Sequence, residues 1–94
     1  MFNDKKYLIF EEKNLKENLQ EKIEELNNNE KVIFEGEYLN GLRWKGKEYN
    51  DNGKIKFEGE YLDGERWKGK EYNDKGESIF EGEYNIYDRK KVNN

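Results

Sequence analysis

The region from residue 34 to residue 84 alternates between aromatic or glycine positions and charged positions. Residues 34–38 read Phe-Glu-Gly-Glu-Tyr, so every second side chain is charged. A period of two is typical of a β-strand whose two faces meet different surroundings. The pairs Asn40-Gly41 and Asn52-Gly53 follow such segments and signal tight hairpin turns. The pattern therefore predicts short antiparallel strands that are joined by hairpins.

This alternating pattern repeats every 23 residues. The sequence Phe-Glu-Gly-Glu-Tyr begins at Phe34, Phe57 and Phe80, and Arg-Trp-Lys-Gly-Lys-Glu-Tyr-Asn begins at Arg43 and Arg66. Self-similarity at a fixed period indicates a repeat architecture in which each unit packs against its neighbours. We divide residues 34–94 into hairpin units at 34–56 and 57–79 and a half repeat at 80–88.

The expected register follows from the rule that directly opposed residues of antiparallel strands share a face. A two-residue loop at Asn52-Gly53 and an odd number of connecting residues at Asn40-Gly41 bring like side chains together. One face is then expected to carry an aromatic row (Tyr38, Trp44, Tyr61, Trp67, Tyr84), a glycine row (Gly36, Gly46, Gly59, Gly69, Gly82) and a mixed row (Phe34, Glu48, Phe57, Glu71, Phe80). The other face is expected to carry two charged rows (Glu35, Lys47, Glu58, Lys70, Glu81 and Glu37, Lys45, Glu60, Lys68, Glu83). The glycines leave room for neighbouring rings to lie on the backbone.

Residues 1–33 show a different pattern. Residues 5–11 contain the apolar run Tyr-Leu-Ile-Phe and are predicted as a strand. Asn14 is followed three residues later by Glu17, an arrangement typical of a helix N-terminus. An apolar stripe at helical spacing follows, made of Leu15, Leu19, Ile23 and Leu26. We therefore predict a single domain that is mainly β with one N-terminal α-helix: residues 1–33 form a strand and an amphipathic helix cap on the aromatic face, and residues 34–94 form an antiparallel β-meander.

The side-chain chemistry argues against catalysis. The 94-residue chain has no His, Cys or Thr, and Ser78 is its only serine. Nucleophilic catalysis needs an activated hydroxyl or thiol, proton transfer near neutral pH usually uses His, and zinc sites use His and Cys. We expect no enzyme activity and no catalytic, cofactor or metal site. The absence of Cys and of an apolar leader favours a cytoplasmic protein.

The motif Phe-Glu-Gly-Glu-Tyr-Leu-Asn-Gly at this period resembles MORN repeats over about residues 34–84. The second half of a MORN unit usually has a Gly-x-Gly pattern, whereas Gly46 and Gly69 stand alone here, so the second strand of each unit departs from the family pattern. The resemblance implies a curved β-meander that is used for protein contacts, self-association or binding to acidic lipids. Bacterial relatives of the YwqK type have been classed as antitoxins. The resemblance therefore implies a fold more firmly than a function.

We expect a protein-binding module that acts as an adaptor or by self-association. Trp and Tyr are frequent at interface hot spots, although rings in a chain with few aliphatic residues also serve as core. The candidate partner-binding residues are Tyr38, Trp44, Tyr61, Trp67, Tyr84, Glu37, Glu60 and Glu83. The alternatives are a small acidic inhibitor of a larger enzyme, antitoxin-like or phage-encoded against a defence nuclease, and binding to acidic lipid. The net charge of −4 is distributed along the chain, so direct binding to nucleic acid or to a membrane is not expected, while a homo-oligomer is left open.

Overall fold

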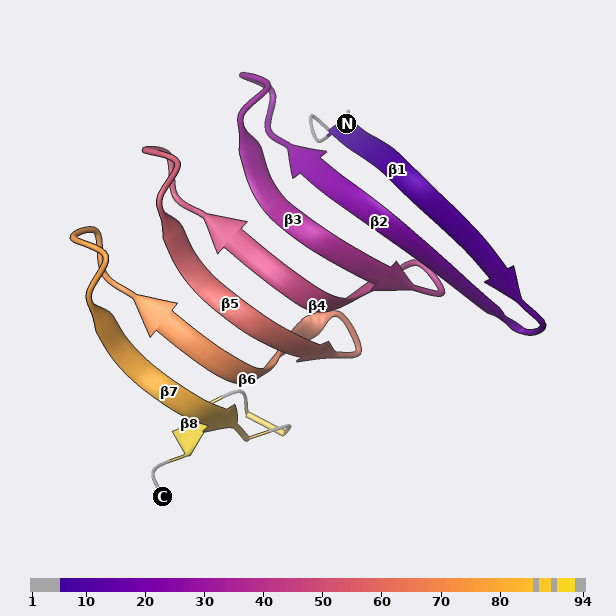
Figure 1. The fold of residues 1–94 in the computed structure, drawn as a ribbon. Coiled ribbons are helices and arrows are strands. Elements are labelled where there is room, and N and C mark those ends of the chain that lie inside the picture. Colours follow the sequence, from indigo (N-terminus) through magenta and orange to yellow (C-terminus); the bar gives the residue numbers. More distant parts are fainter. Residues whose placement is uncertain (1–5, 86, 89, 93–94) are drawn as a thin grey trace.

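The computed structural model describes residues 6–85, 87–88 and 90–92, and these form one antiparallel sheet of eight strands in sequence order (Figure 1). The ends of both predicted regions (1–5 and 93–94), Ile86 of the half repeat, and Arg89 lie outside the described residues. The strands are β1 (Lys6–Leu15), β2 (Asn18–Leu26), β3 (Val32–Leu39), β4 (Leu42–Tyr49), β5 (Ile55–Leu62), β6 (Glu65–Tyr72), β7 (Ser78–Tyr84) and β8 (Lys91–Val92). The described strands make a single layer in which each packs beside its sequence neighbours.

The predicted N-terminal helix is wrong, because residues 18–26 form strand β2. A tight turn, with Lys16 at a φ of 52°, joins β2 to β1. Two members of the predicted helical stripe, Ile23 and Leu26, are buried in the strand instead. Helix preferences differ by only about 0.7 kcal/mol per residue among ordinary residues, and pairing of β2 with strands on both sides outweighs them.

The N-terminal hairpin continues the repeat of the later strands. Glu25-Leu26-Asn27 stands 23 residues before Glu48-Tyr49-Asn50, and the two segments end β2 and β4 in the same way. Glu30, at a φ of 62°, takes the place that Gly53, at 79°, holds in the next turn. The strand predicted at residues 5–11 is confirmed from Lys6 onward and extends to the end of β1. The meander therefore includes the N-terminal region that was predicted to cover it.

Residues that bulge out of the strands set the register of each repeat. The connection at Asn40-Gly41 has two residues, both at positive φ (51° and 84°), and not the odd number that was predicted. The odd residue is Trp44, which bulges between Arg43 and Lys45. Trp67 bulges in the same way one repeat later. Such a bulge leaves its residue unpaired and re-aims the side chain.

The loop around Asn52-Gly53 is also longer than the two residues predicted. Tyr49 pairs with Ile55, and Lys56 bulges before regular pairing resumes at Phe57. The Asn50 amide nitrogen donates to the Lys54 carbonyl at 2.9 Å, which closes the loop. The closing pair Tyr49–Ile55 is one residue out of the predicted register, and the bulge at Lys56 restores it, so Gly46 pairs with Gly59 as predicted.

Beyond the bulges the central rows are confirmed. The five glycines lie directly opposite one another from β3 to β7, and so do the members of the two Glu–Lys rows and of the mixed row. Glu25 extends the mixed row to β2, opposite Phe34. The sheet therefore has two chemically different faces. We name the face with the phenylalanines, tyrosines and buried glutamates the network face, and the face with the Glu–Lys rows the ladder face.

Phenylalanine rings that lie over the glycine row make the core. Phe34 and Phe57 are 0% exposed although they lie in a single-layer sheet. A Cβ atom added to Gly46 would lie 2.6 Å from Cζ of Phe34, and one added to Gly69 would lie 2.9 Å from Cζ of Phe57. Backbone atoms of the opposed strand and these rings together occupy the space that a Cβ atom would need at Gly36, Gly46, Gly59 and Gly69.

Candidate protein-binding face

A buried carboxylate organises the network face of each repeat. Glu48 on β4 accepts a hydrogen bond from the Tyr61 hydroxyl at 2.8 Å and from Nε and Nη2 of Arg66 at 3.0 and 2.9 Å. The Arg66 fork bonds both oxygens of this carboxylate, which is the strong bidentate geometry for such a pair. One repeat supplies the carboxylate and the next supplies its donors.

The same cluster occurs three times along the sheet. Glu25 bonds Tyr38 and both donors of the Arg43 fork, and Glu71 bonds Tyr84 and Lys91. The arginines also connect neighbouring clusters: Nη1 of Arg43 lies 3.8 Å from Glu48, and Nη1 of Arg66 lies 3.4 Å from Glu71. A continuous polar network therefore crosses the network face from β2 to β8.

The guanidinium groups of Arg43 and Arg66 also cover the phenylalanine core, so the network face needs no helix to cover it. The Arg43 guanidinium carbon lies 4.4 Å from the centre of the Phe34 ring, and that of Arg66 lies 4.5 Å from the centre of Phe57. Guanidinium groups stack favourably on aromatic faces while their donors remain available. The lid predicted as a helix on the aromatic face is thus a layer of arginine and tyrosine side chains.

Electrostatics fix the protonation states within the network. Burial alone would oppose ionisation of Glu48, but the hydrogen bonds from Arg66 and Tyr61 outweigh it, so the pKa of Glu48 lies below its usual value. Burial and the neighbouring charge of Glu48 raise the pKa of Tyr61 well above its usual value. Both shifts move titration away from neutral pH, so the network is a fixed structural element and its groups are saturated by one another.

The structure divides the predicted aromatic row between the two faces. Tyr38, Tyr61 and Tyr84 lie on the network face as expected. Tyr38 is opposite Arg43, and not opposite Trp44 as predicted, and the same replacement occurs opposite Tyr61. The aromatic row is therefore wrong in its two tryptophans, because the parity argument did not foresee a bulge within the strand.

Both tryptophans lie beside the lysines of the ladder face. Nζ of Lys45 is 4.5 Å from the centre of the Trp44 ring and 3.3 Å from a carboxylate oxygen of Glu37. Nζ of Lys68 is 4.7 Å from the centre of the Trp67 ring and 3.8 Å from Glu60. Glu83 continues the row on β7, opposite Lys68. The structure therefore brings Trp44, Trp67, Glu37, Glu60 and Glu83 together on one face and leaves the three predicted tyrosines on the other.

The two indoles are half-buried, and their neighbours are accessible. The side chains of Lys45 and Lys68 are 46% and 42% exposed. Nε1 of Trp44 is buried and has no hydrogen-bond partner among the described residues. Lys45 and Lys68 were not among the predicted site residues. In each repeat a lysine directly follows the tryptophan, and the bulge at the tryptophan places the two side chains side by side, where they stack. This Trp-Lys dipeptide is the sequence signal that would have found the lysines.

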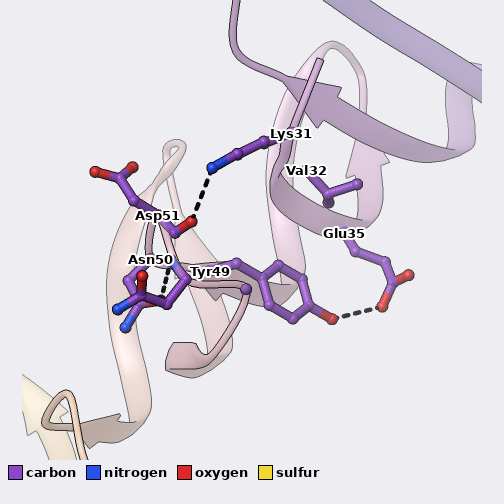
Figure 2. Close-up of a pocket in the computed structure, with 8 residues that line it drawn as sticks. Lys31, Val32, Glu35, Tyr49, Asn50 and Asp51 are labelled. Atoms are coloured by element: carbon purple, nitrogen blue, oxygen red, sulfur yellow. Dashed lines mark hydrogen bonds between the residues drawn. The ribbon is translucent and has the colours of Figure 1, made fainter. Parts of the chain in front are cut away.

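Several shallow hollows occur on the ladder face of the described residues, and two of them are larger than the others. One of about 540 Å³ lies over the glycine row between the two Glu–Lys rows. The other, of about 510 Å³, lies near the β4–β5 turn, where the Tyr49 hydroxyl donates to Glu35 at 2.9 Å and Lys31 Nζ donates to the Asp51 carbonyl (Figure 2). The contacts shown in Figure 2 recur in the next repeat as Tyr72 to Glu58 and Lys54 to Asp74. The contacts beside this second hollow therefore connect successive turns in the same way in each repeat, and their role is structural.

The described residues contain no helix with the length and apolar character that a membrane crossing requires. No family model matches the chain, and the searches of curated proteins and of solved structures gave no match either.

Proposed function

We propose that this chain is a non-enzymatic protein-binding module of MORN-like repeats, and that its partner docks on the ladder face over Trp44 and Trp67. The observation that carries the proposal is one arrangement that occurs twice on this face. In each copy an indole lies under a lysine, and the lysine is bonded to a carboxylate. Tryptophan is the residue most enriched at interface hot spots.

The spacing of the two copies indicates what kind of surface fits them. The indoles lie on β4 and β6, two strands apart, which corresponds to about 10 Å across a sheet. The fitting partner therefore presents two apolar side chains at about this separation, surrounded by charges of both signs. The lysine pairs are exposed, and such pairs contribute only about 0–1 kcal/mol each. They can exchange their partners for groups of a bound protein at small cost.

The network face is less suited to the same role. The carboxylates, tyrosine hydroxyls and arginine forks of Glu48, Tyr61, Arg66 and their equivalents are bonded to one another within the chain. Opening these contacts leaves a buried charge without a partner, which costs about 3–5 kcal/mol. The inhibitor alternative needs a surface of carboxylates to enter a basic cleft, whereas the ladder face carries a lysine beside each of Glu37 and Glu60 and so presents both signs of charge. Matched charges on the ladder face likewise give the lipid alternative no basic surface.

The test begins with affinity capture on the immobilised chain from an extract of its source organism, followed by titration of each captured protein. Trp44 and Trp67 are the only tryptophans in the chain, so their fluorescence reports directly on the proposed site. We expect partner binding to shift this emission. The double variant Trp44→Ala/Trp67→Ala should weaken binding about 30-fold or more, because hot-spot truncations cost about 2 kcal/mol or more.

The matched control is Tyr87→Ser, which removes an aromatic side chain that is 91% exposed and lies outside the ladder face. This control should bind like the unmodified chain. Equal recovery and affinity for the double variant, with an unchanged circular dichroism spectrum, would remove the ladder face from the proposal. Binding to vesicles of acidic phospholipid without any protein partner would favour the lipid alternative.

A further inference from the structure

The first strand is an open sheet edge with an apolar run. In the described part of the chain, β1 pairs only with β2, so one side of its backbone has no strand partner. Four consecutive apolar side chains on this edge are exposed: Tyr7 at 46%, Leu8 at 45%, Ile9 at 52% and Phe10 at 64%. An exposed, long edge strand of this kind is a template for pairing with another strand.

The opposite edge of the sheet has these properties to a smaller degree. In the described residues β8 pairs with only Glu83 and Tyr84 of β7, and the unpaired part of β7 exposes one large apolar side chain, Ile79 at 56%, against four in a row on β1. β8 has only two residues, Lys91 and Val92, and follows the exposed Lys90. Short edge strands and lysines are the usual protection against unwanted pairing. The contrast locates the pairing surface at β1, an edge that is separate from the ladder face.

The charge pattern of β1 is self-complementary in one orientation. A lysine, Lys6, precedes the apolar run, and two acidic residues, Glu11 and Glu12, follow it. Antiparallel pairing of two copies brings the lysine end of each toward the acidic end of the other. Within the chain Lys6 pairs with Glu30 and Glu11 pairs with Lys22, so the match between copies acts on net charge at each end and not on unpaired groups. Parallel pairing in register would place lysine against lysine and glutamate against glutamate, which is destabilising.

The faces of the strand fix the centre of such a pair. Tyr7 and Ile9 lie opposite Glu25 and Ile23, so both are on the network face, while Leu8 is on the ladder face. A two-fold axis perpendicular to the sheet keeps each residue on its own face. Centring the axis on Leu8 places Tyr7 opposite Ile9 of the other copy, and both are on the same face. Centring it on Ile9 would oppose Tyr7 to Glu11, which lies on the other face beyond the bulge at Phe10.

We propose that the chain self-associates through β1, by antiparallel pairing with a second copy about a two-fold axis at Leu8. The pairing joins two meanders into one continuous sheet and covers Tyr7, Leu8 and Ile9 of both copies. Half-exposed side chains of this size cover about 400 Å² per copy, roughly half of a standard interface. The dimer is therefore weak, with dissociation in the micromolar range or above, and it is independent of the function proposed for the ladder face.

Sedimentation velocity on the purified chain, from micromolar to millimolar concentration, tests the association. We expect a monomer–dimer equilibrium with no larger species. Leu8→Lys places two like charges opposite each other at the axis and should weaken the dimer about tenfold or more. Val92→Lys makes the same change at the other edge and should have no effect. A chain that stays monomeric, assembles beyond dimers, or is weakened equally by both variants overturns the proposal.

Cysteine crosslinking tests the orientation, since the chain contains no cysteine of its own. A mixture of Tyr7→Cys and Ile9→Cys chains should form mixed disulfide dimers at least about tenfold faster than either variant alone forms dimers, because only directly opposed residues approach to about 5 Å. Faster crosslinking within each variant than between them contradicts the antiparallel pair. The variant Trp44→Ala/Trp67→Ala should dimerise like the unmodified chain, so failure of the ladder-face proposal is distinguishable from failure of this one.

Discussion

Replacement of Glu48 by alanine should be among the most destabilising single changes in this chain. The Glu48 side chain is 12% exposed, and its removal leaves the Arg66 fork and the Tyr61 hydroxyl without their acceptor. Breaking a buried ion pair costs about 3–5 kcal/mol, and the partial exposure of Arg66 places this site at the low end. We therefore expect a loss of about 3 kcal/mol, out of a total of about 5–14 kcal/mol for a chain of this length.

Urea unfolding followed by tryptophan fluorescence measures this loss. With a slope of about 1.5 kcal/mol per molar urea, the midpoint should fall by about 2 M. The matched control is Glu60→Ala, which removes the same charge from an exposed side chain that lies 3.8 Å from Lys68. This control should cost about 0–1 kcal/mol. If Glu48→Ala destabilises the chain no more than Glu60→Ala does, the network face does not hold the repeats together.

Three further predictions concern the Glu48–Arg66 contact and the glycine row. The lowered pKa of Glu48 means that its contribution is complete above about pH 4.3 and is lost as the pH falls toward the folded-state pKa, so urea midpoints should drop more steeply in acid for the unmodified chain than for Glu48→Gln. Gly59→Ala, whose Cβ would lie 2.2 Å from the Lys68 carbonyl oxygen, should cost about 3 kcal/mol or more in the same assay, whereas Gly53→Asn, in an open turn, should cost less than about 1 kcal/mol. Arg66→Lys keeps the charge but loses the fork and the stacking on Phe57, and its unfolding free energy should fall by about 1–2 kcal/mol.

The chain itself contains a precedent for the last substitution. Lys91 occupies the place over Phe80 that Arg66 occupies over Phe57, at 5.3 Å from the ring centre. Phe80 is only partly buried, whereas Phe57 is fully buried. A flexible ammonium group covers a ring less completely than a planar guanidinium, and Phe80 also lies on β7 beside the short edge strand β8.

The sequence was sufficient to predict the rows that depend on side-chain alternation. Opposed pairs such as Glu35 with Lys47 and Gly36 with Gly46 follow from the requirement that each face be chemically consistent, and they are confirmed. This requirement determines whether the shift between strands is odd or even. It does not determine where an extra residue lies, so the bulge at Trp44 was assigned to a turn, and the indole was placed on the wrong face.

The N-terminal region was mispredicted because a local pattern competed with a long-range one. The stripe from Leu15 to Leu26 fits a helix, but Glu25-Leu26-Asn27 also fits the end of a repeat strand. The network of buried glutamates was missed for a related reason. Its members are 13 and 18 residues apart, as in Glu48 with Tyr61 and Arg66, and only the register of paired strands brings them together.

The buried glutamate of one unit is bonded by the tyrosine and arginine of the next unit. This dependence between neighbours determines how an array of this kind can lengthen during evolution. An in-frame gene duplication of 23 codons adds one network glutamate and also the tyrosine and arginine that bond it, so the longer protein retains the contacts of the network. A duplication one codon shorter displaces the pairing by a single residue, turning glycines toward solvent and lysines into the core. The array therefore lengthens by whole units. Each added unit places one more tryptophan on the ladder face and leaves the contacts of the network face unchanged.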